Sequence, residues 1–538
     1  MGLGTSNGRL VKTGSLMGMT VEQTRVSLQK TLDEGRSAQL RNRLGQFATP
    51  TQLARDVVRC GLKLLGPDVS IRFLDPAFGT GSFYSALLEA KPSLSTAAGF
   101  EIDAHYGVPA IELWRKSGLQ LTLGDFTKAA PPAPREAFNF IVCNPPYVRH
   151  HHISTEEKER LQGLVPESTG ARIRGLAGLY CYFLLLAHRW MAPDAIAGWL
   201  LPSEFMDVKY GQAVKDYLLN TVTLLRLHRF EPADVQFADA LVSSAVVWFK
   251  NSPAPPNCSV KFTFGGSLAE PARTKIISAS TLHREPKWTR VLTNESSEDV
   301  SPSLSPATLR LGDLFATKRG LATGDNKFFI LDEHQVLELG LSRRFLRPIL
   351  PSPRYLPSDV VVADAAGDPL VARRLFLIDC PLPLDELDTC DPALARYLRA
   401  GADTVANGYL CSSRSPWYSQ EKRPPAPFLC TYMGRRDDNG EKAFRFIWNR
   451  SNATAANVYL LMYPKGVLNA ALNSQPDLGA TVLRLLNAIP CRDMTREGRV
   501  YGGGLHKLEP LELANVPAAQ IGAILPLTMR RRAAQLSL

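Results

Sequence analysis

A short apolar segment that ends in two prolines most constrains how this chain can fold. Residues 140–143 are apolar on both faces, which predicts a buried strand of a parallel sheet. The segment runs directly into Asn144, Pro145, Pro146 and Tyr147. Neither proline can donate to the strand ladder, so the chain must leave the sheet at Asn144. This places an amide, fixed carbonyls and an aromatic ring at the carboxyl edge of the sheet, where α/β folds bind ligands.

These groups suit chemistry on an amino group that is conjugated to a ring. Such a group is a poor nucleophile because its lone pair is delocalised, and two acceptors that grip its hydrogens would draw it towards a tetrahedral shape. The Asn144 side-chain oxygen and the Pro145 carbonyl can be these acceptors, and Tyr147 offers a flat face for a planar substrate. A strand-terminating turn with a packed tyrosine has the same pattern, so this segment alone does not decide the function.

A glycine loop and an acidic residue follow two earlier predicted strands. Residues 71–83 are typical of a strand, a glycine turn and a helix, with Asp75 before Gly79 and Gly81. The glycines allow a ligand to approach the backbone closely, and the missing Gly-Lys-Ser/Thr excludes a phosphate loop. Glu101 lies 20 residues beyond Gly81 at the end of the next strand, an offset that suits an acid binding ribose hydroxyls.

Two more segments complete the predicted binding edge. Asp125 and Phe126 follow a short strand, where an acid could accept from an adenine amino group and an aromatic ring could cover the adenine. Thr49 and Pro50 predict the start of a helix, with Thr49 as the N-cap, whose N-terminus could hold a carboxylate. Each acid alone is typical of a cap or a turn, but acids at successive strand ends favour a nucleoside site.

With these motifs in this order, the chain resembles the gamma class of S-adenosylmethionine-dependent DNA adenine (N6) methyltransferases of restriction–modification systems. The resemblance covers residues 41–250 with specific motifs and residues 310–520 more loosely. It implies a doubly wound, seven-stranded, Rossmann-like α/β domain and a mixed α/β target-recognition domain. It also implies methyl transfer from S-adenosyl-L-methionine to the N6 amino group of adenine in double-stranded DNA, with the base flipped out of the helix.

The resemblance also implies roles for individual residues. Thr49 would contact the methionine carboxylate, the Asp75–Gly81 loop would wrap the methionine portion, and Glu101 would hold the ribose. Tyr147 and Phe237, which lies in the loop before the final strand of the sheet, would stack on the flipped base. The implied catalytic residues are Asn144, Pro145, Pro146 and Tyr147, and the implied cofactor-binding residues are Thr49, Asp75, Pro76, Ala77, Gly79, Gly81, Glu101, Ile102, Asp125 and Phe126.

The remaining organisation follows from composition. We expect an N-terminal extension at 1–40 with a loose tail and a peripheral helix, and a methyltransferase domain at 41–250. A Ser- and Pro-rich connector at 251–305, with one short strand from Val260 to Phe264, and a target-recognition domain at 306–538 follow. The net charge of +11 favours a polyanionic partner, here double-stranded DNA. Basic residues that could contact it are Arg149, Arg319, Arg414 and Arg450.

Several classes of protein are disfavoured. No apolar run is long enough for a bilayer and no signal peptide is visible, while nine scattered cysteines are typical of a reduced, cytoplasmic protein. Adjacent histidines at 150–152 cannot easily converge on one ion, so we expect no metal.

We expect a monomer that acts separately from any cognate restriction endonuclease. N4-cytosine methylation, protein glutamine methylation and a DNA-binding module with an inactive domain remain alternatives, although the intact acidic residues argue against the last.

Overall fold

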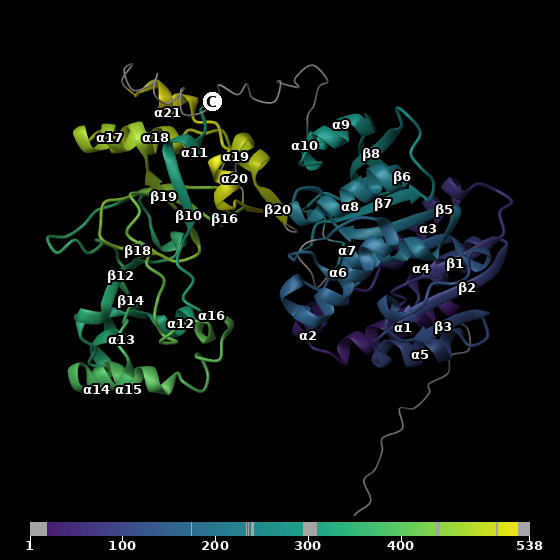
Figure 1. The fold of residues 1–538 in the computed structure, drawn as a ribbon, viewed down its shortest axis with the longest axis horizontal. Coiled ribbons are helices and arrows are strands. Elements are labelled where there is room, and N and C mark those ends of the chain that lie inside the picture. The colour runs from purple at the N-terminus through teal and green to yellow at the C-terminus, as the bar shows by residue number, and fades with distance from the viewer. Residues whose placement is uncertain are drawn as a thin grey trace, which may run out of the picture. The chain divides into compact units, whose positions relative to one another are not determined.

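The computed structural model describes residues 19–173, 175–232, 234, 236–237, 242–293, 309–435, 442–501 and 504–525. The chain divides into two compact units, Met1–Glu295 and Ser296–Leu538, each with its own hydrophobic core (Figure 1). No helix in the described part of the chain combines the length and the apolar character that crossing a membrane requires.

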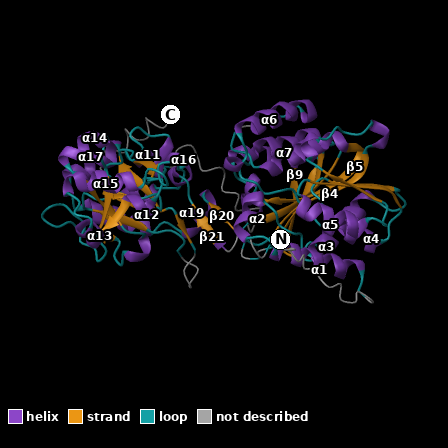
Figure 2. Ribbon diagram, turned by 90° about the horizontal axis from the view of Figure 1, so that it is seen from below, coloured by secondary structure: helices purple, strands orange, loops and turns teal. Residues whose placement is uncertain are grey.

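A nine-stranded mixed sheet organises the first unit, in the order β3-β2-β1-β4-β5-β7-β6-β8-β9 (Figure 2). Neighbours from β3 to β5 pair in parallel, and β7 pairs antiparallel with both β5 and β6. The first seven strands of the chain therefore form the predicted doubly wound Rossmann-like sheet, and this fold class is confirmed. The strands are β1 (Ile71–Asp75), β2 (Leu94–Glu101), β3 (Leu119–Leu123), β4 (Phe138–Cys143), β5 (Met191–Pro202), β6 (Thr223–Arg229), β7 (Ser244–Lys250), β8 (Ser259–Gly266) and β9 (Pro271–Ser278).

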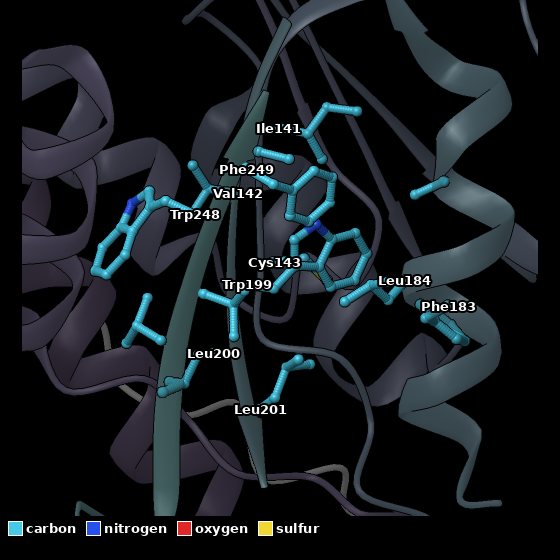
Figure 3. Close-up of a cluster of buried hydrophobic side chains, with 14 of the residues drawn as sticks. Ile141, Val142, Cys143, Phe183, Leu184, Trp199, Leu200, Leu201, Trp248 and Phe249 are labelled. Atoms are coloured by element: carbon cyan, nitrogen blue, oxygen red, sulfur yellow. The ribbon is translucent and has the colours of Figure 1, made fainter. Parts of the chain in front are cut away.

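The centre of this sheet is buried on both faces, which explains the near-continuous apolar sequence of β4. Figure 3 shows Ile141 to Cys143 of β4 among bulky side chains from β5 and β7, including Trp199 and Trp248, with Phe183 from α7 nearby. The helices of this unit are α1 (Val21–Glu34), α2 (Ala38–Leu44), α3 (Thr51–Leu65), α4 (Ser82–Ala90), α5 (Ala104–Trp114), α6 (Thr155–Thr169), α7 (Leu179–Leu186), α8 (Gln212–Asp216), α9 (Ala279–Arg284) and α10 (Thr289–Thr293).

The segment expected to be a connector differs from the prediction. Within 251–305, β8 pairs in parallel with β6, and β9 pairs antiparallel with β8, so two strands extend the sheet. Val260 and Phe262 are fully buried, and Trp288 is 1% exposed. The alternating apolar residues of β8 cover the open edge of β6, whereas the prolines of 251–256 lie in the turn before it. The strand predicted from Val260 to Phe264 is present within β8, whereas β9 was not predicted.

The N-terminal extension also differs from the expected peripheral helix. α1 begins with a capping box in which Thr20 and Gln23 satisfy each other's backbone N–H groups. It packs against α4 and α5, and its Arg25 is only 2% exposed. Residues 1–18, the predicted loose tail, lie outside the described residues.

The second unit is mixed α and β, as predicted for this part of the chain. It contains sheets of five, four and three strands, in the orders β10-β19-β15-β17-β13, β11-β14-β12-β18 and β16-β21-β20. The strands are β10 (Phe315–Arg319), β11 (Ile330–Asp332), β12 (Leu346–Leu350), β13 (Val360–Val361), β14 (Leu375–Ile378), β15 (Phe428–Thr431), β16 (Met433–Gly434), β17 (Phe446–Asn449), β18 (Thr454–Ala455), β19 (Tyr459–Pro464), β20 (Arg499–Tyr501) and β21 (Leu505–Lys507). The helices are α11 (Leu311–Leu314), α12 (Asn326–Phe329), α13 (Glu333–Glu338), α14 (Leu384–Cys390), α15 (Pro392–Ala400), α16 (Tyr409–Ser412), α17 (Gly466–Ser474), α18 (Leu478–Asn487), α19 (Cys491–Glu497), α20 (Pro510–Ala514) and α21 (Ala519–Ala523).

Candidate active site

The orientation of one amide side chain defines the centre of the site. Asn144 follows β4, and its Nδ2 donates to the Phe47 carbonyl at 2.8 Å and to the Thr49 hydroxyl at 3.1 Å. A carbonyl can only accept, so the amide nitrogen must face it. The Asn144 Oδ1 atom is left buried, with no hydrogen-bond partner among the described residues. A buried acceptor without a donor is costly, which makes this atom a candidate for contact with a ligand N–H.

Three aromatic rings gather beside this amide. Tyr147 is 7% exposed, and its hydroxyl donates to the Leu200 carbonyl at 3.2 Å. Its ring centroid lies 5.7 Å from that of Phe47 and 5.8 Å from that of Phe237, and Phe47 and Phe237 are 5.6 Å apart. The structure thus brings Phe237 to Tyr147, although 90 residues separate them. Phe47 was missed because an aromatic before Thr-Pro has no sequence signal of its own.

The glycine loop lies at the end of β1. Gly79 and Gly81 have φ angles of 56° and 91°, in the left-handed region that favours glycine. A Cβ at Gly81 would come within 2.7 Å of the Phe78 and Trp114 side chains, whereas one at Gly79 would meet nothing within 4 Å. Gly81 is therefore required by packing, and Gly79 faces open space, as a backbone approached by a ligand should.

Two buried acids flank this loop. Asp75 is 1% exposed and accepts from the Ala77 N–H at 3.1 Å, and burial, with some help from the charge of Glu101, raises its pKa to about 8. Glu101 accepts from the N–H groups of Gly79 at 2.9 Å and Asp103 at 2.8 Å. Burial also raises the pKa of Glu101. Both carboxyl groups keep further lone pairs with which to accept from hydroxyl or ammonium groups.

The next residues at this edge have contrasting environments. Ile102 is 69% exposed, so the structure holds an apolar side chain in the open directly after Glu101. Asp125 accepts from the Thr127 N–H at 2.9 Å and from its hydroxyl at 2.8 Å, and so caps the short 3-10 helix Phe126–Lys128. Phe126 is 2% exposed and packs against Phe100, Phe183 and Trp190. These contacts show Phe126 in a core role, and its contact with a cofactor stays a prediction.

The Thr-Pro segment borders a cavity of about 540 Å³. α3 begins at Thr51 with Pro50 as its N-cap residue, one residue later than predicted, because Pro50 has a non-helical ψ of 143°. Thr49 is 6% exposed, and its hydroxyl accepts from Asn144 instead of capping the helix. The cavity is lined by Ala48 to Thr51, by residues of α1, and by Arg36 and Arg41.

These residues fit S-adenosylmethionine in chemical character. The cavity has the size of a typical small-molecule site. The glycine loop supplies open backbone at Gly79, and Asp75 and Glu101 supply acceptors next to it. Among the described residues no group of three or more His, Cys, Asp or Glu side chains could hold a metal ion.

The four predicted DNA-contacting arginines have different surroundings. Arg149 is exposed and precedes the short 3-10 helix His150–His152. Arg319 and Arg450 are exposed and lie over the Tyr432 and Trp448 rings, at 4.4 and 5.0 Å respectively. Arg414 is half-buried, and its guanidinium donates to the carbonyls of Ala322 at 2.7 Å and Thr323 at 2.6 Å. None of these contacts tests DNA binding, which stays a prediction.

The strand order defines a Rossmann-like α/β fold of the methyltransferase type. The fold resembles that of the type IIL restriction-modification enzyme MmeI, solved in complex with DNA, with a TM-score of 0.51 and 13% identity. The match covers 83% of this chain and 66% of MmeI, so this chain spans just under two thirds of that enzyme.

Sequence comparisons show which methyltransferases this chain is similar to. Residues 98–236 match the family "Eco57I restriction-modification methylase", and residues 285–533 match "Type II methyltransferase M.Eco57I, C-terminal domain". The chain is 28% identical to type II methyltransferase M.XamI of Xanthomonas campestris pv. amaranthicola, over 88% of this chain and 84% of that protein. It is 23% identical to M.AccI of Acinetobacter calcoaceticus, over 90% and 87% respectively. This chain is thus similar to type II restriction–modification methyltransferases over most of its length.

Proposed function

We propose that this protein transfers a methyl group from S-adenosylmethionine to the N6 amino group of adenine in double-stranded DNA, as the modification enzyme of a restriction–modification system. The observation that carries the proposal is the buried Oδ1 atom of Asn144, which has no partner among the described residues. The relatives named as type II methyltransferases support the reaction class, and MmeI, whose fold this chain resembles, was solved bound to DNA.

The target amino group would be held by two acceptors. Asn144 Oδ1 is fixed in place because Phe47 and Thr49 hold its nitrogen, so it would accept one amino hydrogen without reorganisation. The Pro145 carbonyl follows in a stiff segment and would accept the other. Both contacts would draw the nitrogen towards a tetrahedral shape and make its lone pair available.

The aromatic group would hold the flipped base. Tyr147, Phe237 and Phe47 present rings close to the amide, and base–aromatic stacking contributes about 1–3 kcal/mol per base. Such stacking would offset the few kcal/mol that flipping a base from the duplex costs. S-adenosylmethionine supplies an electrophilic methyl group, and the residues of this chain would bind it, orient it and exclude water from the reacting nitrogen.

The direct test is to identify the methylated product. The purified protein is incubated with S-adenosylmethionine and duplex DNA, and the nucleosides are then analysed by mass spectrometry, with single-molecule sequencing for the methylated motif. We expect N6-methyldeoxyadenosine at one defined motif. N4-methyldeoxycytidine would refute the target base, and methylated glutamine in a protein without any DNA product would refute the proposal as a whole.

The Asn144→Ala variant tests the central residue. We expect methyl transfer to fall by about 100-fold or more, as when a fixed hydrogen-bonding group is removed from a transition state, while cofactor binding by calorimetry is retained. Asn139→Ala is the matched control: this amide on the same strand bonds the Arg72 N–H and the Ser70 carbonyl, away from the site. Activity of Asn144→Ala within tenfold of the parent would remove Asn144 from the mechanism.

A further inference from the structure

The first described helix lies against the segments that would hold the cofactor. α1 packs on α4 and α5, the helices that follow β1 and β2 in the chain (Figure 1). Arg25, Val26 and Gln29 of α1 line the 540 Å³ cavity opposite the Thr49–Thr51 segment. Residues 21–34 lie outside both spans that the family models match. No sequence motif therefore indicates what this helix does.

One buried guanidinium connects α1 to two loops. Arg25 Nε and Nη2 donate to the Glu22 carboxylate at 2.7 and 2.6 Å, and Nη2 also donates to the Thr51 hydroxyl at 3.3 Å. Nη1 donates to the hydroxyls of Thr80 at 3.2 Å and Ser82 at 2.9 Å. A guanidinium has five N–H donors, and these contacts use all of them. Arg25 therefore has no donor left for a ligand, and its role is to hold protein groups in place.

The groups that Arg25 joins belong to the two segments that would grip the methionine end of the cofactor. Thr51 begins α3, two residues after Thr49, and its hydroxyl also donates to Glu22 at 2.6 Å. Thr80 lies in the glycine loop, and its hydroxyl donates to Gln29 of α1 at 2.6 Å. The spacing between the start of α3 and the glycine loop is thus set through α1.

The far end of α1 is attached to the end of β2. The Tyr106 hydroxyl donates to Asp33 at 2.9 Å. Arg36, just beyond the helix, forms an ion pair with Asp103 and donates to its Oδ1 at 2.9 Å. Asp103 lies two residues after Glu101, the residue expected to bind the ribose. α1 is therefore bonded near its start to Thr51 and the glycine loop, and near its end to Tyr106 and, through Arg36, to Asp103.

We propose that α1 forms a wall of the S-adenosylmethionine pocket and that Arg25 is a positioning residue, which holds the start of α3 and the glycine loop at the spacing the cofactor needs. This inference rests on the proposed function. A buried ion pair contributes little to net stability compared with well-packed apolar side chains, so stability alone is a weak reason for Arg25 and Glu22. The planar fork of arginine, however, fixes the geometry of several acceptors at once, which lysine cannot do.

The test compares cofactor affinity with catalysis. The double variant Glu22→Gln/Arg25→Met removes the fork without leaving an unpaired buried charge. We expect its S-adenosylmethionine Kd by calorimetry, and its cofactor KM, to rise by about tenfold, the equivalent of about 1.4 kcal/mol. The kcat at saturating cofactor and the KM for DNA should change by less than about threefold, because Arg25 touches neither the target base nor DNA. Arg25→Lys should raise the cofactor KM as well, because it keeps the charge but loses the fork.

A matched control separates positioning from general destabilisation. Arg226 of β6 also links distant segments, donating to Cys60 Sγ at 3.3 Å and the Leu268 carbonyl at 2.6 Å. Arg226→Met should lower Tm without raising the cofactor Kd. If Arg226→Met raises the Kd as much as the double variant does, or if the double variant binds cofactor within threefold of the parent, the inference is overturned.

Two further outcomes are a double variant that does not fold and a parent protein that does not bind the cofactor. If the double variant does not fold, Gln29→Ala removes the acceptor of the Thr80 hydroxyl while leaving the ion pair intact, and should raise the cofactor KM by about threefold. An unchanged KM in that variant would then refute the inference. If the parent protein itself binds no S-adenosylmethionine, the proposed function fails and not the role of Arg25 alone.

Discussion

Asn144 in the first unit and Arg414 in the second show how differently the two units use their polar side chains. Asn144 has its amide nitrogen held by Phe47 and Thr49, while its oxygen is left buried without a partner among the described residues. Arg414 directs its donors to the carbonyls of Ala322 and Thr323 and so fastens a loop of its own unit. Asn144 therefore keeps a hydrogen-bond acceptor available for a ligand, whereas Arg414 uses its donors to hold a loop of the second unit.

Dividing the protein between the units would test this comparison most severely. Every proposed catalytic and cofactor residue lies in Met1–Glu295, so removing residues 296–538 should abolish sequence-specific DNA methylation while cofactor binding is retained. Methylation is measured on DNA that contains the motif of the full-length protein, and calorimetry measures cofactor binding. Solubility and cofactor binding of the shortened protein are the controls. A shortened protein that still methylates the full-length motif would contradict the assignment of target recognition to the second unit.

The next largest effect should come from Glu101. Its carboxylate holds the Gly79 N–H and is expected to hold the ribose, so Glu101→Ala should weaken S-adenosylmethionine binding by about 1.5–3 kcal/mol, as for hydrogen bonds to a charged group. Calorimetry gives the dissociation constant. Glu89→Ala is the matched control, because Glu89 at the end of α4 pairs on the surface with Arg55. An unchanged Kd in Glu101→Ala would reject the ribose assignment.

Residues of the candidate site could be predicted from the sequence where a suitable polar or aromatic side chain stands at the end of a predicted parallel strand. Asn144 and Tyr147 follow β4, Asp75 and Glu101 are the last residues of β1 and β2, and parallel strands bring their carboxyl ends to one edge. Phe47 could not be predicted in the same way, because only the folded backbone shows that its carbonyl holds the Asn144 amide. A carbonyl belongs to every residue, so its use leaves no trace in the sequence.

The errors of the sequence analysis have physical causes as well. β9 and the pairing of β8 with the sheet were missed because flanking prolines and serines made the segment 251–305 look like a connector. α1 looked peripheral because its polar residues are typical of an exposed helix, yet Arg25 is buried by pairing with Glu22. For Arg414, the structure adds bonds to nearby carbonyls that the sequence does not show, and its contact with DNA stays a prediction.

Arginine variants in the second unit should sharpen the comparison. Arg450 is exposed over Trp448, so Arg450→Ala should cost about 1–3 kcal/mol and relax one base of the motif if it reads a guanine. If it meets a phosphate instead, binding should weaken equally on all sequences. Arg414→Ala is the contrasting variant, because it should lower Tm through loss of the bonds to Ala322 and Thr323. Titration of matched and scrambled DNA measures the DNA binding of both variants, and thermal unfolding measures the Tm of Arg414→Ala. Unchanged binding by Arg450→Ala would remove Arg450 from the interface.

The last effect should appear in the pH dependence of stability, through Asp75. Burial raises the pKa of Asp75 in the folded protein to about 8, above its ordinary value of 3.8. Between these values the unfolded chain releases the proton and the folded protein keeps it, so folding stability falls as pH rises through this window. Asp75→Asn cannot ionise but keeps an oxygen for the Ala77 N–H, so it lacks this loss. Relative to the parent, the variant should gain stability between pH 5 and pH 7.5, which appears as a growing difference between the two Tm values without cofactor. Thermal unfolding at both pH values measures this gain, and parallel pH profiles of the two proteins would show that Asp75 is already ionised in the folded protein.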